Sequence, residues 1–331
     1  MLKTLGTSWL LGVATATLLQ AQTGTLVVLN KRANTADIID VASGQTLRTL
    51  PTGLVPHEAA ISRDGRVVVA TDYGARSGGT SLTIIDVPGM QVARTADLGD
   101  HIGPHGIAFL PGDSLVAVTT ERTRDVVIVR VADGLVVRSI DTDQAGSHML
   151  ALVGDGSTIY TSNMGDNSVA ELDVESGRRM RTFTVPARPE AITVTQDGTE
   201  IWVGSNDEGT VNTVDTRTGR YEQVLDGLSW PYRILIAPDN RLVLIPDLGQ
   251  HVLRFVDRVN RRELKRLEFD GAGPQGITLD TYAQVAFLSL SQQNRIALID
   301  LGTREVFRYI DAGDGPDGIV YSPLVLASSR E

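Results

Sequence analysis

The chain contains no cysteine among its 331 residues. This absence excludes disulfide bonds, thiolate metal ligands, cysteine nucleophiles and a lipid-modified N-terminal cysteine. It is compatible with an oxidising compartment, where a free thiol is a liability. Any metal site or catalytic group must therefore be built from other side chains.

Basic residues are in deficit, with 30 Lys and Arg against 40 Asp and Glu and a formal net charge of −10. The acidic residues are spread along the chain rather than gathered in runs. A protein that binds nucleic acid usually carries a basic stripe that neutralises phosphates. The sequence has no such stripe, so we expect no nucleic-acid partner. A small-molecule substrate is expected, and a protein partner stays possible.

Long apolar runs are missing after the start of the chain. Lys3, the apolar run 5–19 and the small residue Ala21 are typical of a secretory signal peptide, which we place at residues 1–21. The run is shorter than the ~20 residues that span a bilayer and contains Thr and Gly, which disfavours an uncleaved anchor. We therefore predict a periplasmic or secreted protein that does not span a membrane.

The sequence does contain a repeat. A short motif that usually starts with proline occurs seven times, and its copies begin 48, 43, 42, 42, 43 and 42 residues apart. The copies start at Pro56, Pro104, Ser147, Pro189, Pro231, Pro274 and Pro316. A nearly fixed period of this size indicates a repeat architecture with one structural unit for each copy.

Between the motifs the sequence is typical of β-structure. Runs rich in Val, Ile and Thr, such as 26–29, 67–70 and 115–119, are separated by Asp-Gly and Ser-Gly turns, and no stretch has sustained helical periodicity. About four strands in each unit is the pattern of a β-propeller blade. We predict that residues 22–331 form a single all-β, seven-bladed β-propeller.

The register of the repeat also predicts how the ring closes. The mature chain begins in the middle of a unit, and it ends soon after the first strand of another. The last blade should therefore combine an inner strand from the C-terminus with three outer strands from the N-terminus. Such closure leaves no open sheet edge at the ends of the chain.

The unit 189–219 shows the most regular order of features. It has a proline, an inner strand, an Asp-Gly turn, a second strand ending near Asn206, a third strand ending in Val-Asp, and then Thr-Gly. In this order it resembles the YVTN-repeat β-propellers, which include YncE-like and lactonase-like proteins, and the likeness extends over residues 25–323. The resemblance implies the fold. It says less about activity, because the group also includes surface-layer proteins and relatives of haem-bearing nitrite reductase propellers.

The second position of the motif varies between copies, and we expect function there. Inner strands line the channel of a propeller, so these side chains should form a ring at one face. The ring contains His57, His105, His148, Glu190, Tyr232, Gln275 and Asp317. Three imidazoles with an open position are the layout of a catalytic metal site. We predict a divalent transition metal (Zn, Cu, Fe or Mn) bound by His57, His105, His148 and Glu190; a histidine copied by duplication without a ligand role is the alternative.

Further residues beside this ring are candidate catalytic groups. Glu190 or Glu58 could take a proton from an activated water, and Glu190 could instead support a ligand. Tyr232 is a further candidate catalytic group, and Arg233, which follows it, could hold a substrate carboxylate in a bidentate pair. The structural alternative is that Arg233 pairs with a neighbouring Asp such as Asp247.

The ends of the second strands reach the same face, because successive strands of a blade run antiparallel. We expect substrate contacts from these ends and from two members of the first ring: Asp72, Tyr73, Glu121, Asn163, Asn206, Asp247, Gln275 and Asp317. Asn and Asp also commonly close turns, which is the structural interpretation for each of the Asn and Asp residues.

Two functions fit these observations. The first is a metal-dependent enzyme that acts on a small molecule, where zinc would favour hydrolysis and copper or iron an oxidative reaction. Lactone opening as the hydrolytic reaction is implied by the family resemblance. The second function is that of a non-catalytic exported propeller that binds a ligand or a protein.

Overall fold

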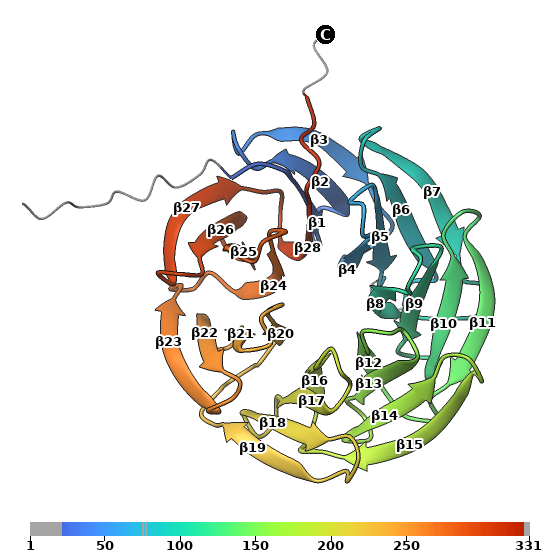
Figure 1. The fold of residues 1–331 in the computed structure, drawn as a ribbon. Helices are drawn as coiled ribbons and strands as arrows, with labels where there is room; N and C mark the ends of the chain where they lie inside the picture. The colour runs from blue at the N-terminus through green and yellow to red at the C-terminus, as the bar shows by residue number, and fades with distance from the viewer. Residues whose placement is uncertain (1–21, 75, 77, 328–331) are drawn as a thin grey trace, which may run out of the picture.

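The computed structural model describes residues 22–74, 76 and 78–327. In these residues 28 β-strands form seven four-stranded antiparallel sheets, and no helix is present. The sheets stand around a central axis as blades (Figure 1). The predicted all-β, seven-bladed β-propeller is confirmed. The predicted signal peptide, residues 1–21, lies outside the described part of the chain.

Each blade has an inner strand at the channel and a second strand behind it. The inner strands are β4 (Pro56–Ile61), β8 (Pro104–Phe109), β12 (Ser147–Leu152), β16 (Pro189–Val194), β20 (Leu235–Ile236), β24 (Pro274–Leu279) and β28 (Pro316–Ser322). The second strands are β5 (Val67–Asp72), β9 (Leu115–Thr120), β13 (Thr158–Asn163), β17 (Glu200–Ser205), β21 (Leu242–Asp247), β25 (Val285–Leu290) and β1 (Thr25–Asn30).

Two further strands complete each blade toward the rim. The third strands are β6 (Ser81–Asp86), β10 (Asp125–Arg130), β14 (Ser168–Asp173), β18 (Thr210–Asp215), β22 (Val252–Asp257), β26 (Arg295–Asp300) and β2 (Thr35–Asp40). The outer strands are β7 (Gln91–Asp97), β11 (Leu135–Asp141), β15 (Arg178–Thr184), β19 (Tyr221–Leu225), β23 (Arg262–Glu268), β27 (Glu305–Asp311) and β3 (Thr46–Pro51).

The hydrophobic core lies between neighbouring blades. Both faces of each sheet are covered, so the middle strands are apolar on both sides. In one cluster, Val69 and Ile84 of one blade pack against Val118 and Val127 of the next. Similar clusters follow around the ring in the described residues. These contacts hold neighbouring blades together.

The last blade is built from both ends of the chain. Strand β28 pairs with β1 in antiparallel register, with Ile319 opposite Val28. The sheet order is β28-β1-β2-β3, with the C-terminal strand innermost (Figure 1). The predicted closure of the ring is therefore confirmed, and backbone hydrogen bonds hold both terminal strands.

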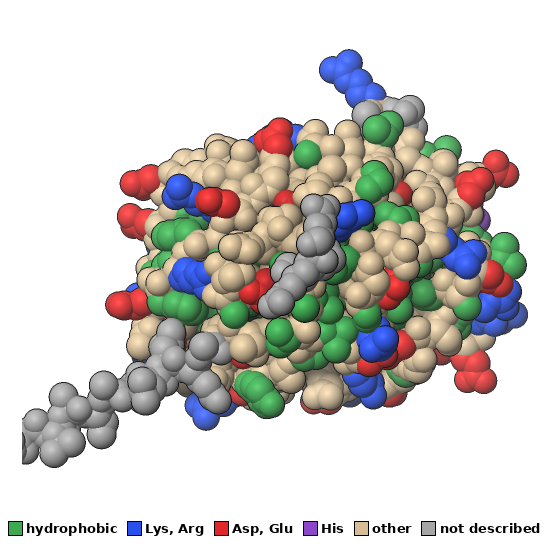
Figure 2. Space-filling model, turned by 90° about the horizontal axis from the view of Figure 1, so that it is seen from above, with side chains coloured by type: hydrophobic (Ala, Val, Ile, Leu, Met, Phe, Trp, Pro, Cys, Tyr) green, Lys and Arg blue, Asp and Glu red, His purple; other side chains and the backbone are tan. Residues whose placement is uncertain are grey.

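The outer surface carries charges of both signs. Figure 2 shows acidic and basic side chains interspersed on one side of the ring, without a continuous basic stripe on that face. Among the described residues, no helix is long and apolar enough to cross a membrane.

A β-bulge lies at the second position of the motif, where the sequence predicts function. In β4 two residues, His57 and Glu58, lie opposite the single residue Thr71 of β5. Register shifts occur at the same motif position in β8, β12, β16 and β24. A bulge bends the strand and re-aims its side chains. The repeated motif thus marks the place where the inner strands leave regular pairing.

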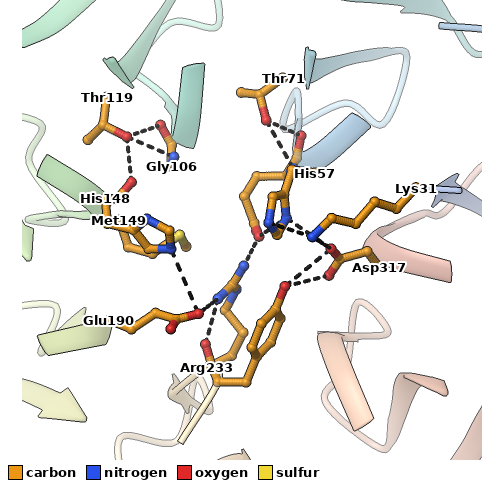
Figure 3. A network of polar contacts seen from close by, with 12 residues as sticks. Lys31, His57, Thr71, Gly106, Thr119, His148, Met149, Glu190, Arg233 and Asp317 are labelled. Atoms are coloured by element: carbon orange, nitrogen blue, oxygen red, sulfur yellow. Dashed lines mark hydrogen bonds and ion pairs between the residues drawn. The ribbon is translucent and has the colours of Figure 1, made fainter. Parts of the chain in front are cut away.

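Hydroxyl groups satisfy backbone amides at these bulges. Thr71 Oγ1 accepts a hydrogen bond from the amide of Glu58 at 3.0 Å, and Thr119 Oγ1 accepts one from the amide of Gly106 at 2.8 Å. The Thr119 hydroxyl also contacts the carbonyl of His148 in the next blade at 2.6 Å (Figure 3). Neighbouring bulges are tied together in this way, which positions the channel side chains relative to one another.

Candidate functional site at the channel mouth

The three histidines of the motif lie side by side in consecutive blades. The ring centroids of His57 and His105 are 4.2 Å apart, and those of His105 and His148 are 3.7 Å apart. All three side chains are buried. The ring of Tyr73 stands edge-on to His57 and His105, with centroid distances of 5.5 and 5.1 Å. The structure therefore brings the three predicted imidazoles together.

His105, the middle histidine, lacks a hydrogen-bond partner. Its side chain is fully buried, and neither Nδ1 nor Nε2 is bonded within the described residues. Burial, with His148 and His57 adding to it, holds the pKa of His105 well below its ordinary value. The ring is therefore neutral and offers a lone pair. Because buried polar groups are nearly always bonded, this exception marks a place that a bound water or a ligand would satisfy.

A compact group of potential metal ligands adjoins this row. Among the described residues, His57, Glu58 and Asp317 have ligand atoms that all lie within 4.8 Å of one another. His57 Nδ1 is 2.9 Å from Asp317 Oδ2 and 3.5 Å from Glu58 Oε1, although Nδ1 makes no aligned hydrogen bond. We call these three residues the triad. From the sequence, His57 is a predicted metal ligand, Glu58 a predicted base and Asp317 a predicted substrate contact.

Lys31 places its ammonium group on two members of the triad (Figure 3). Its Nζ lies 2.8 Å from His57 Nε2 and 3.2 Å from Asp317 Oδ2. Burial lowers the pKa of His57, and Lys31 adds to this effect while Asp317 opposes it. Burial disfavours ionisation of Asp317, but His57 and Lys31 outweigh it and hold the pKa of Asp317 below its ordinary value. The imidazole is thus neutral and the carboxylate ionised.

Tyr232 and Arg233 reach the triad from the blade with the shortest inner strand, β20. The Tyr232 hydroxyl donates to Asp317, with distances of 3.1 and 3.2 Å to the two carboxylate oxygens. Burial, with Asp317 and Glu190 adding to it, raises the pKa of Tyr232 well above its ordinary value, so the hydroxyl keeps its proton. Tyr232 therefore orients Asp317.

Arg233 pairs with carboxylates of the site itself. Its guanidinium lies 4.1 Å from the centroid of the Tyr232 ring, bonds to Glu58, and is 3.7 Å from Glu190. Burial lowers the pKa of Arg233 to about 10. The alternative pairing with Asp247 is wrong, because Asp247 pairs with Arg254. Arg233 thus holds the position of Glu58.

His148 has the opposite charge state to His57. Its Nδ1 is 3.2 Å from Glu121 Oε2, and its Nε2 is 3.7 Å from Glu190 Oε1. Burial disfavours the charged ring, but the hydrogen bond to Glu121 and the charges of both carboxylates outweigh it and raise the pKa of His148 to about 9. At neutral pH both ring nitrogens of His148 therefore carry protons in the metal-free protein, so a metal would have to displace one of these protons to bind it.

Three of the predicted substrate contacts, Tyr73, Glu121 and Asn206, belong to the group of side chains around His148 and Glu190. The Tyr73 hydroxyl donates to Glu121 Oε2 at 2.9 Å, and Asn206 Nδ2 donates to Glu190 Oε2 at 2.5 Å. Trp230 Nε1 donates to the same Glu190 oxygen at 2.8 Å. Glu190 therefore has its oxygens engaged by the protein and lies against His148 rather than within the triad.

The remaining predicted contacts have other surroundings. Three of them bond inside their own blades. Asp72 accepts hydrogen bonds from Ser81 and Thr83, and Asn163 bonds to Ser147 and Ser168. Asp247 bonds to Arg254 and to the amides of residues 229 and 230. Gln275 is buried in β24. The last residue of a second strand thus supports its blade, whereas the residue after it, such as Tyr73 or Glu121, reaches the channel.

Two residues of the site, Lys31 and Trp230, were not predicted from the sequence. Lys31 follows β1 as Tyr73 follows β5 and Glu121 follows β9, so the strand register contained a signal for it. Trp230 precedes a motif proline, and no other copy has an aromatic residue there. Comparison between repeats therefore could not identify Trp230.

The donor groups fit a divalent metal ion. Neutral imidazoles at His57 and His105 and carboxylates at Glu58 and Asp317 are donor types that Zn, Fe and Mn accept. The unbonded nitrogens of His105 support this fit. Both carboxylates now pair with protein cations, Asp317 with Lys31 and Glu58 with Arg233.

A closed ring of seven blades with a polar channel mouth defines the protein as a β-propeller. No family model and no curated protein matches its sequence. The likeness to YVTN-repeat proteins therefore stays a prediction.

Solved structures share the fold. The chain is similar to hydrazine synthase from Kuenenia stuttgartiensis, with 18% identity, a TM-score of 0.72, and coverage of 87% of this chain and 99% of that one. A functionally unknown protein from Desulfotomaculum acetoxidans has 15% identity and a TM-score of 0.74, covering 90% and 99%. The dihydro-heme d1 dehydrogenase NirN, in complex with DHE, has 13% identity and a TM-score of 0.69, covering 92% and 77%. At such identities the likeness establishes the fold alone.

Proposed function

We propose that the protein is a metal-dependent enzyme that acts on a small molecule at the channel mouth. The observation that carries this proposal is His105, a fully buried neutral imidazole with two unbonded nitrogens beside the triad. Two of the three structural neighbours are enzymes by name, which is compatible with catalysis on this scaffold. We further propose export, on the apolar run near the N-terminus and the absence of cysteine.

We assign the ion to His57 and Asp317 of the triad, with Glu58 beside them, and add His105, whose ring centroid is 4.2 Å from that of His57. A bound metal would supply Lewis-acid activation of a carbonyl group and of the attacking water. Tyr232 orients Asp317 through its hydroxyl, and Arg233 orients Glu58. In this proposal Arg233 positions a carboxylate of the protein instead of gripping one of the substrate.

Hydrolysis, with lactone opening as the first reaction to test, suits the proton-carrying groups. Water adds to the acyl carbon, the ring C–O bond breaks, and the departing oxygen takes a proton. Glu58, whose side chain is 13% exposed, is suited to accept the proton of the water. His148, with a pKa raised by Glu121 and Glu190 to about 9, holds a proton that it could give to the departing oxygen.

The second candidate is a non-catalytic propeller that binds a ligand or a protein partner. The pairing of Asp317 with Lys31 and of Glu58 with Arg233 favours it, because an ion-pair network that neutralises its own carboxylates can serve stability alone. Copper or iron at the same donors would instead favour an oxidative enzyme, and the identity of the metal decides between these reactions.

Metal analysis of protein purified without added metal tests the proposal. We expect about one equivalent of Zn, Cu, Fe or Mn, or its uptake on addition, and loss of that metal in His105→Ala with an unchanged circular dichroism spectrum. His251→Asn is the matched control, because His251 lies outside the site at a φ of 59° that asparagine tolerates. Absence of metal both before and after addition would overturn the proposal. Metal binding without hydrolysis of a lactone panel favours the binding module.

A further inference from the structure

Lysine is rare in this chain, and one lysine lies in the site. The 30 basic residues are 27 arginines and three lysines, Lys3, Lys31 and Lys265. Lys265 pairs with Glu305 at the rim of the ring, at 3.2 Å. A chain that uses arginine at almost every basic position thus has a lysine where a cation touches both His57 and Asp317.

The two basic side chains differ in how they meet a ligand group. An ammonium is a compact point charge on a flexible four-carbon stem, whereas guanidinium is a rigid planar fork. The Lys31 ammonium contacts one imidazole nitrogen and one carboxylate oxygen, 2.8 and 3.2 Å away. A small cation bound to His57 Nε2 and to Asp317 would take the place of this ammonium. Lys31 therefore behaves like a cation bound to part of the triad.

Two protein cations compensate the triad, and their surroundings differ. The side chain of Arg233 is 10% exposed, stacks on Tyr232 and bonds to Glu58. The side chain of Lys31 is 30% exposed and starts at the end of β1. Withdrawal of Lys31 returns its ammonium to water, whereas withdrawal of Arg233 would strip a buried, stacked guanidinium of its partners. Lys31 is the cation that can leave.

We propose that Lys31 is a displaceable cation of the metal site: it occupies the His57 and Asp317 contacts in the metal-free protein, and a divalent ion binds by exchange with it. This inference rests on the proposed metal site. Lys31 compensates the buried carboxylate of Asp317 when no metal is bound. It also weakens the binding of any cation that cannot outcompete an ammonium, which favours divalent over monovalent ions.

Calorimetric titration with Zn²⁺ and with Mn²⁺ tests the exchange. We expect Lys31→Met to bind metal about tenfold more tightly than the wild type, because the competing charge is gone while the length of the side chain is kept. Lys31→Arg should bind more weakly, since its larger fork fills the same place. Lys265→Met is the control for loss of a lysine, and we expect its metal affinity to equal that of the wild type.

A second measurement uses the wild-type protein. Lysine labelled with ¹³C at Cε gives few NMR signals in this chain, and the two methionine variants assign those of Lys31 and Lys265. Saturation with Zn²⁺ should move the Lys31 signal toward that of a solvated lysine and leave the Lys265 signal in place. This readout does not require that Lys31→Met remains as stable as the wild type.

The outcomes separate the two proposals. If the wild type binds neither Zn²⁺ nor Mn²⁺, and Cu²⁺ and Fe²⁺ tested in the same way also fail to bind, the metal site and the exchange are both wrong. If the wild type binds metal while its Lys31 signal stays in place, the metal site stands and the exchange is wrong. Equal or weaker metal binding by a folded Lys31→Met also contradicts the exchange alone.

Discussion

His57 and His148 occupy equivalent positions in the repeat, yet they are held in opposite charge states. His57 lies between a lysine and a carboxylate, and burial lowers its pKa. His148 lies between two carboxylates, which overcome burial and raise its pKa to about 9. The neutral ring of His57 can offer a lone pair, whereas the charged ring of His148 can donate protons. The repeat thus places the imidazoles, and residues from other strands determine their chemistry.

His105 lies between these two regions, 4.2 Å from His57 and 3.7 Å from His148 between ring centroids. Its ring is neutral like that of His57, but no side chain or backbone group in the described residues bonds to it. In the proposed site His105 is a ligand of the metal on the His57 side, and the protonated ring of His148 lies next to it. If all three histidines simply bound one metal, the surroundings of His57 and His148 would not differ in this way.

Removal of Asp317 should have the largest effect on the His57 side. Asp317→Ala leaves Lys31, His57 and the Tyr232 hydroxyl without their shared partner, and a broken buried pair costs about 3–5 kcal/mol in the free energy of unfolding. Urea denaturation measures the loss. Asp314→Ala breaks the exposed pair with Arg32 and should cost less than about 1 kcal/mol. Equal losses in the two variants would mean that the buried contacts of Asp317 add no more stability than an exposed ion pair.

The pH dependence of stability should sharpen the contrast at His148. Its folded pKa of about 9 lies above the ordinary value of 6.5, so its contribution is complete below pH 6.5 and is lost as the pH rises through 9. The difference in free energy of unfolding between the wild type and His148→Gln should shrink by roughly 3 kcal/mol across this window. A difference that is constant from pH 6 to 10 would contradict the assigned charge state.

Glu121→Gln is the matched variant for that measurement. It keeps the shape of the side chain and removes one of the two charges that raise the pKa of His148. NMR titration should then show a lower His148 pKa than in the wild type. An unchanged midpoint would assign the effect to Glu190 alone.

Tyr73→Phe should have the smallest effect. The variant keeps the edge-on ring against His57 and His105 and removes the hydroxyl that donates to Glu121. Loss of one such hydrogen bond costs about 1 kcal/mol, seen as a modest decrease in denaturation midpoint. A loss as large as that of Asp317→Ala would show that Tyr73 is essential to the packing of the histidines.

The fold was predictable because its signals are local and repeated. Asp-Gly turns, runs of β-branched residues and a period near 42 occur in unit after unit, so each copy supports the assignment of the others. The same register predicted the pairing of β28 with β1. It also brought His57, His105 and His148 to one place, since equivalent positions of neighbouring blades meet at the channel.

The partners of these histidines were harder to predict. Lys31 reaches His57 from the neighbouring blade, 26 positions earlier, and it contacts Asp317 across the ring closure, 286 positions away. Tyr232 reaches Asp317 over 85 positions. Asp72 and Tyr73 are adjacent, yet Asp72 bonds inside its blade while Tyr73 faces the histidines. Such differences depend on the direction of single side chains at a strand end, which composition and period do not report.

The sequence by itself determined the number of blades, the closure of the ring and the presence of three imidazoles at one channel mouth. Only the tertiary structure decided that one imidazole lies against a lysine, one between two carboxylates, and one against neither. The physical reason is that strand formation and blade packing depend on local, repeated apolar patterns. The charge of a buried imidazole depends instead on the few groups within hydrogen-bonding distance, and these come from different blades.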